Sequence, residues 1–126
     1  MIRLRVDEVC RLHQMLCAAS GGSDGLRDRG LLESAVLSMD AAFGEVERYP
    51  SLEEKAARLA YGLISNHPFV DGNKRIGVLA MLALLRANGI ELRYTQRELT
   101  AFGLDAAAGK LDYADILAWI GSHAFE

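Results

Sequence analysis

Apolar residues recur at intervals of three and four along most of the chain, which is the spacing of one face of an α-helix. The first such stretch covers residues 6–19 and stops before a glycine pair. The second covers residues 29–39, and Asp28 in front of it is a suitable N-cap. Residues 40–50 lack helical spacing and are expected to form a loop. The inward stripe of the first helix is Val6, Val9, Cys10, His13, Leu16 and Cys17.

The next two helices meet at a short connection. Ser51 and Glu54 form a capping box, which opens a helix. That helix should end by about Asn66, because Pro68 disfavours the helical conformation in the residue before it. The following helix, at about 73–88, is apolar nearly all round, which is typical of a helix at the centre of a core.

The last third of the chain repeats these signals. A short extended piece is expected over residues 90–94, and a second capping box over residues 95–98 opens a helix that ends at Gly109. Asp112 caps a final helix, which continues to His123. The pattern therefore predicts an all-α bundle around the helix at 73–88.

The composition is that of one soluble domain spanning residues 1–126, with 51% hydrophobic and 25% charged residues. No apolar run reaches the roughly 18 residues of a membrane-spanning helix, and no export signal is visible, so a cytoplasmic protein is expected. A net charge of −3 argues against general nucleic-acid binding. Cys10 and Cys17 lie two helical turns apart, roughly 10 Å, which is too far for a disulfide and predicts reduced thiols. His13 and His123 are interpreted as packing or helix-end residues.

The nine residues 67–75 connect the two central helices and read His-Pro-Phe-Val-Asp-Gly-Asn-Lys-Arg. His67 can accept a proton near neutral pH, and Asp71 is a natural ligand for Mg²⁺. Gly72 allows close backbone approach to a ligand. Side chains suited to phosphate follow at the start of the helix, where backbone N–H groups also favour anions: Asn73, Lys74 and Arg75.

Each of these residues also has a purely structural interpretation. A histidine beside a proline at a helix end is often structural, and Asp71-Gly72 is a common turn sequence. Lys74 and Arg75 could be solvated cations. However, cations at a helix N-terminus oppose the helix dipole, so their placement favours an anion-binding site.

The segment from His67 to Arg75 resembles the signature of the Fic/Doc superfamily, H-x-F-x-[DE]-[GA]-N-[GK]-R. The Asn73-Lys74-Arg75 version is similar to the Doc branch, the death-on-curing toxins of Phd–Doc type toxin–antitoxin systems. The resemblance implies a Fic-like all-α bundle and a transferase that uses ATP and Mg²⁺. It covers most of the chain, including residues 21–35 and the C-terminal helix.

The resemblance also assigns roles to residues. His67 would be the general base that acts on a hydroxyl of a target protein, and Asp71 would hold the metal. Phe69 would be a buried anchor for the loop. Nucleotide phosphates would be held by Gly72, Asn73, Lys74 and Arg75. A flap that docks the target is expected within residues 21–29, with Arg27, Asp28 and Arg29 as candidates.

Two departures from the broader Fic pattern bear on the reaction. Members that transfer AMP read G-N-G-R followed by a second arginine three residues later, whereas this chain has Lys74 and Val78 at those places. The Doc branch, which shares the lysine, transfers the γ-phosphate, so a protein kinase is favoured over an AMP transferase. A non-catalytic binding module remains a third hypothesis.

The family also implies partners. Its known target is elongation factor Tu, modified on threonine, which arrests translation. The inhibitory motif S/T-x-x-x-E-G/N of many Fic enzymes does not occur in these residues. Inhibition is therefore expected from a Phd-like antitoxin, whose C-terminal segment would fold into an apolar groove of the bundle.

Overall fold

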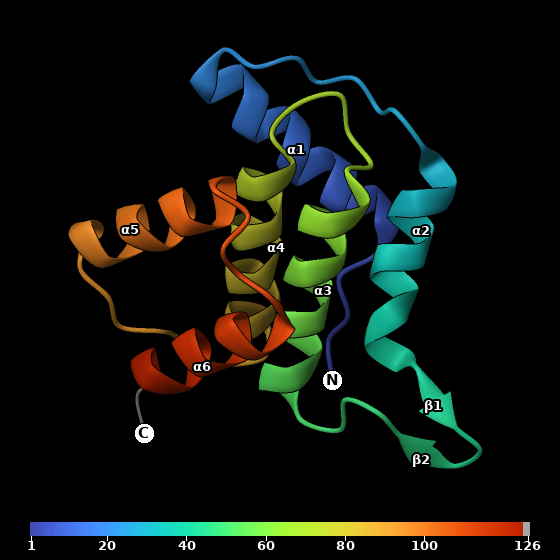
Figure 1. Cartoon of the computed structure of the whole chain (residues 1–126). Coiled ribbons are helices and arrows are strands. Elements are labelled where there is room, and N and C mark those ends of the chain that lie inside the picture. The colour runs from blue at the N-terminus through green and yellow to red at the C-terminus, as the bar shows by residue number, and fades with distance from the viewer. Residues whose placement is uncertain (125–126) are drawn as a thin grey trace.

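The computed structural model describes residues 1–124 and is a bundle of α-helices (Figure 1). The predicted all-α fold is confirmed, and the helices lie within two residues of the expected bounds. Along the described chain the elements are α1 (Val6–Ser20), α2 (Arg29–Leu37), the 3₁₀ turn η1 (Ser38–Asp40), β1 (Ala42–Phe43), β2 (Val46–Glu47), α3 (Leu52–Asn66), α4 (Asn73–Ala87), α5 (Gln96–Ala107) and α6 (Tyr113–His123).

Helices α3 and α4 form the centre of the bundle, with α2 on one flank and α5 and α6 on the other (Figure 1). The two backbones come close at Gly77. A Cβ atom at this position would lie 2.7 Å from Cγ1 of Ile64 and 3.1 Å from the carbonyl oxygen of Ala60. Glycine is therefore required there for the two helices to pack. The prediction that the fourth helix is central is confirmed, since Ile76, Ala80, Met81, Leu84 and Leu85 are fully buried.

The predicted N-caps are also confirmed. The hydroxyl of Ser51 accepts a hydrogen bond from the backbone N–H of Glu54 at 3.1 Å, and Thr95 accepts one from Glu98 at 3.1 Å. The carboxylate of Asp28 accepts from the third residue of α2. These local contacts satisfy N–H groups that a helix start leaves unpaired, which explains why the boundaries could be predicted from short motifs.

Residues 40–50 do not form a simple loop, and this prediction was wrong. They contain the antiparallel hairpin of β1 and β2, with Gly44 in the left-handed conformation at its tip (φ 65°). The strands have two residues each, and Phe43 and Val46 are 91% and 72% exposed. A strand without a buried face gives no alternating pattern, so the sequence carried no signal for it.

The base of the hairpin is held by a buried lysine. The Lys55 ammonium donates hydrogen bonds to the carbonyl oxygen of Met39 and to a carboxylate oxygen of Glu47, both at 3.1 Å. Only 5% of its side chain is exposed. These two acceptors compensate the burial of the charge.

Other expectations concern single residues and segments. Cys10 and Cys17 are free thiols, as predicted. His13 is buried in α1 and His123 ends α6, so both are packing or helix-end residues as expected. Among residues 1–124, no helix has the length and apolarity needed to span a membrane.

Candidate active site

The predicted site lies in the connection between α3 and α4. His67 is the C-cap of α3 and Gly72 the N-cap of α4, and both have left-handed backbone conformations (φ 50° and 78°). Such a conformation is ordinary for glycine but uncommon for histidine. His67 is the one described non-glycine residue with positive φ, so the surrounding contacts must hold it in place.

Residues 21–29, where the target-docking flap was expected, run alongside this connection. The two segments form an isolated antiparallel bridge between Leu26 and Phe69. This pairing places the expected flap directly against the loop that carries His67 and Asp71. Backbone hydrogen bonds of 2.8–2.9 Å join Val70 N–H to Gly25 C=O, and both Arg27 N–H and Asp28 N–H to Pro68 C=O.

The three candidate docking residues of the flap have other contacts in this structure. The Arg27 guanidinium donates to the carbonyl oxygens of Asn66 and His67, at 3.0 and 2.7 Å, and so caps the end of α3. Asp28 caps α2. Arg29 pairs with Glu33 at 3.0 Å on the surface of α2. Arg27 thus supports the backbone of the loop between α3 and α4, and a contact of these residues with a target stays a prediction.

Asn73 has a structural contact that the sequence did not indicate. Its side chain is buried and closes on the backbone of Phe69: the amide oxygen accepts from Phe69 N–H at 2.9 Å, and the amide nitrogen donates to Phe69 C=O at 3.0 Å. Phe69 is itself only 2% exposed, so it is buried as the resemblance implied, and its role as the anchor of the loop stays a prediction. Because both amide atoms of Asn73 are already engaged, phosphate binding at this residue would have to come from its backbone N–H.

The orientation of the His67 ring suits a general base. Its Nδ1 atom lies 3.2 Å from the carbonyl oxygen of Ser65. A carbonyl oxygen only accepts hydrogen bonds, so Nδ1 carries the proton in this contact. In the neutral ring the lone pair is then on Nε2, and the side chain is exposed. This nitrogen is free to accept a proton from a substrate.

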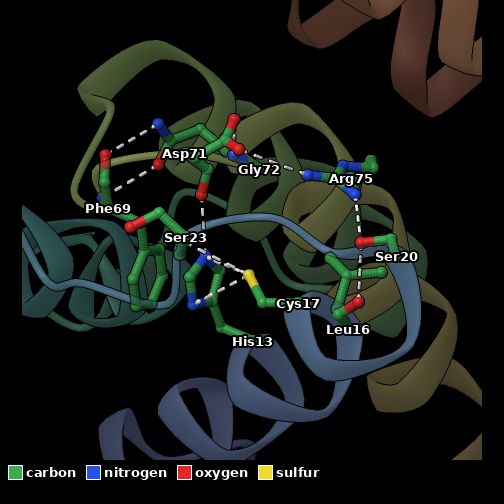
Figure 2. A network of polar contacts seen from close by, with 10 residues as sticks. His13, Leu16, Cys17, Ser20, Ser23, Phe69, Asp71, Gly72 and Arg75 are labelled. Atoms are coloured by element: carbon green, nitrogen blue, oxygen red, sulfur yellow. Dashed lines mark hydrogen bonds and ion pairs between the residues drawn. The ribbon is translucent and has the colours of Figure 1, made fainter.

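Asp71 and Arg75 lie close together where the loop enters α4. One carboxylate oxygen of Asp71 accepts from Gly72 N–H at 2.8 Å, and the other is 3.8 Å from the guanidinium of Arg75. Arg75 also donates to the hydroxyl of Ser20 at the end of α1 (Figure 2). The Asp71 side chain is 55% exposed, so its carboxylate remains accessible to a metal ion.

An open pocket of about 900 Å³ collects these groups. At one end it is lined by His67, Asp71 and the first turn of α4, including Lys74 and Arg75. The other end is apolar and lies between α4 and α5, where Val78, Leu79, Leu82 and Leu99 line it. A polar end with N–H donors and cations beside an apolar end suits a nucleotide.

The donor set fits a magnesium ion that accompanies a nucleotide. The described residues contain no group of three His, Cys, Asp or Glu side chains able to hold a metal between them. Mg²⁺ is commonly bound by one or two carboxylates, with phosphate oxygens and waters completing its shell. Asp71, exposed in the pocket, can supply such a carboxylate.

The contacts of His13 beneath the loop were not predicted from the sequence. His13 of α1 is fully buried, and its Nε2 atom lies 2.7 Å from the carbonyl oxygen of Asp71 (Figure 2). Its ring stacks on Phe69, with centroids 3.8 Å apart and planes inclined by 9°. The sequence shows His13 only as one position of an apolar stripe, and nothing local indicates a partner 58 residues away.

Comparison with known proteins agrees with this geometry. The model of the Fic/DOC family matches residues 3–85, about two thirds of the chain. A relative from Mycolicibacterium smegmatis named "Toxin Doc" is 45% identical over 74 residues. That match covers 59% of this chain and 57% of the relative, so the chain aligns with little more than half of that protein. The matched family region contains the loop of His67, Asp71 and Arg75, and the chain belongs to the Fic/DOC family.

Proposed function

We propose that this protein is a toxin that phosphorylates a hydroxyl group of a target protein, with ATP as the phosphate donor. The observation that carries the proposal is the pocket itself. It is large enough for a nucleotide and is lined by His67, Asp71, Lys74, Arg75 and the N-terminus of α4. Family membership and the relative named "Toxin Doc" support the assignment of the protein as a toxin of the Fic/DOC family.

In the proposed reaction His67 acts as general base. Its Nε2 accepts the proton of the target hydroxyl while the hydroxyl oxygen forms a bond to the γ-phosphorus of ATP. The bond between that phosphorus and the β–γ bridging oxygen breaks, and ADP leaves with the bonding electrons. Lys74, Arg75 and the N–H groups of α4 stabilise the negative charge on the phosphates. A magnesium ion at Asp71 would neutralise further phosphate charge.

The choice of phosphate over AMP rests on Lys74 and Val78. Lys74 lines the pocket and brings a side chain and a charge to a place where AMP-transferring relatives have glycine. The extra group changes how a triphosphate can approach the first turn of α4. Val78, on the same helix, replaces the arginine that those relatives carry, so a cation is missing one turn further along.

The proposed biological setting follows the family. The target is a threonine of elongation factor Tu, whose modification arrests translation in the cytoplasm. A Phd-like antitoxin neutralises the toxin by placing an apolar segment on the bundle. Coexpression with a Phd-like antitoxin tests this partner: it should copurify and restore growth of a host that expresses the toxin.

The reaction is tested by the intact mass of elongation factor Tu after incubation with this protein, ATP and Mg²⁺. The expected product gains one phosphate. The variant His67→Ala should reduce the rate by about 10²- to 10⁴-fold, because it removes the base. It should leave stability nearly unchanged, since the side chain is exposed. His123→Ala, a histidine outside this pocket, is the matched control and should transfer at the wild-type rate.

The other outcomes are informative. A gain of one AMP would retain the site but contradict the argument from Lys74. No gain on elongation factor Tu, together with growth arrest that His67→Ala abolishes, would indicate a different target. No gain and no growth arrest would identify a non-catalytic binding module.

A further inference from the structure

A second histidine lies directly beneath the catalytic loop. His13 projects from α1 and is 0% exposed. Its ring is nearly parallel to the ring of Phe69, and its Nε2 atom is 2.7 Å from the backbone oxygen of Asp71. Cys17, one turn further along α1, lies 3.5 Å from the same ring nitrogen (Figure 2). A helix at the start of the chain thus contacts both the anchor of the loop and its carboxylate residue.

The hydrogen bond to Asp71 has only one possible direction. A backbone carbonyl oxygen accepts and never donates, so Nε2 of His13 carries the proton. The thiol of Cys17 has its own acceptor, the carbonyl oxygen of Ser23 at 3.4 Å. His13 therefore directs a donor at the loop from a position that water does not reach.

This donor holds one rigid unit of the backbone. The carbonyl group of Asp71 and the N–H group of Gly72 belong to the same planar peptide. The carbonyl oxygen accepts from His13, and the N–H donates to the Asp71 carboxylate at 2.8 Å. A rotation of this peptide would break both bonds, so the direction of the peptide also sets the direction of the carboxylate.

We infer that His13 is a positioning residue, which fixes the peptide between Asp71 and Gly72 and thereby aims the carboxylate into the pocket. The inference rests on the proposed function, because it assigns the carboxylate a role in transfer. Gly72 also lies close to the imidazole: a Cβ atom at this position would be in van der Waals contact with Nε2 of His13, at 3.5 Å.

Two variants separate the hydrogen bond from packing. His13→Phe keeps a ring against Phe69 but removes the donor. His13→Gln removes the ring but keeps an N–H donor on a side chain of similar reach. His123→Phe is the matched control, since His123 also stacks on an aromatic ring, that of Trp119 at 4.2 Å, and lies outside the pocket.

Five quantities are measured for each full-length variant: hydrogen exchange of the amides of residues 68–75, thermal stability, kcat for transfer, KM for the target protein, and the Mg²⁺ concentration that gives half-maximal rate. In His13→Phe the loop amides should exchange faster, and kcat should fall roughly 10- to 100-fold, as for other residues that orient a metal ligand. The Mg²⁺ requirement should rise, while KM for the target protein stays constant. His13→Gln should recover part of kcat, and His123→Phe should match the wild type.

Each result decides the inference. If loop exchange, kcat and Mg²⁺ dependence of His13→Phe equal those of the wild type, the inference is wrong. Equal losses in both His13 variants, in step with lower thermal stability, would also overturn it, because packing alone would explain them. If the wild-type protein transfers nothing, the proposed function fails separately. Loop exchange and ATP–Mg²⁺ binding in His13→Phe then decide the inference: faster exchange with weaker binding supports it, and unchanged values contradict it.

Discussion

Two connections flank α3: residues 67–72 after it and residues 41–51 before it. The first is held by contacts from α1, from the segment before α2 and from α4. The second is the hairpin of β1 and β2, which projects from the opposite end of the bundle and is tied to it at its base through Lys55 (Figure 1). Each contains a phenylalanine and a left-handed glycine, Phe69 with Gly72 and Phe43 with Gly44.

The difference shows what fixes a loop in place. The hairpin pairs its two strands with each other and exposes Phe43 and Val46, so it depends on α3 mainly through the Lys55 contact at its base. The loop of His67 and Asp71 contains no regular structure and depends on hydrogen bonds from distant residues. A site that must present a base and a carboxylate in a set geometry needs such external support.

The largest expected effect is a difference in stability between alanine variants of the two phenylalanines. Phe69→Ala should lower the free energy of unfolding by about 3–5 kcal/mol, because a 2% exposed ring leaves a cavity beside His13. Phe43→Ala, where the ring is 91% exposed, should change it by less than about 0.5 kcal/mol. Urea denaturation measures both. A cost above about 1 kcal/mol at Phe43 would mean that the hairpin packs against a partner, such as a second copy.

Alanine substitutions at the two left-handed glycines should have a smaller effect on stability, and they separate stability from activity. Alanine at Gly72 or at Gly44 should cost about 1–2 kcal/mol, because both positions have positive φ. Only Gly72→Ala should also impair phosphate transfer, since its Cβ would meet the Arg75 guanidinium at 3.2 Å, whereas Gly44 has open space around it. Equal activity of the two variants would show that the loop tolerates displacement.

The smallest expected effect concerns a third connection, residues 88–95. Other elements hold it less than they hold residues 67–72 but more than they hold the hairpin. Arg93 N–H donates to His123 C=O at 2.9 Å, and the His123 ring is 2.7 Å from the Glu98 carboxylate of α5. The hydrogen bond to the Trp119 carbonyl, with help from Glu98, raises the pKa of His123 above 6.5. A backbone hydrogen bond from Thr95, together with His123, lowers the pKa of Glu98 below 4.5.

The sign of the pH dependence follows from these directions. The raised pKa of His123 stabilises the fold below pH 6.5, and this contribution disappears as the pH rises through the folded pKa. The contribution of Glu98 disappears as the pH falls through its own lowered pKa. Wild type should therefore exceed His123→Gln in urea midpoint at about pH 5.5 and by less at about pH 8.5. A difference that grows toward high pH would contradict the assignment.

Much of the fold was predictable because its signals are local. The caps at Ser51 and Thr95 act within four residues, and the apolar spacing reports which face of a helix is buried. The motif from His67 to Arg75 likewise predicted a loop at a helix start, and the structure brings His67, Asp71, Lys74 and Arg75 to one pocket.

The remaining features depend on partners far away in the sequence. Arg27 caps α3, a contact that the sequence did not indicate, and the amide of Asn73 binds the backbone of Phe69. His13 was expected to pack but also holds the peptide after Asp71. A side chain's partner depends on which elements meet in space, and periodicity does not contain that information.

The helices, their buried faces and the chemical groups of the site could be predicted from the order of the amino acids, since each depends on residues within a turn or two. Which of those groups stay accessible and which hold the loop depends on the packing of the helices. A backbone carbonyl oxygen such as that of Asp71, or a backbone N–H such as that of Phe69, forms a hydrogen bond with whichever suitable side chain reaches it. The packing of α1 and α4 around the loop determines which side chains do so.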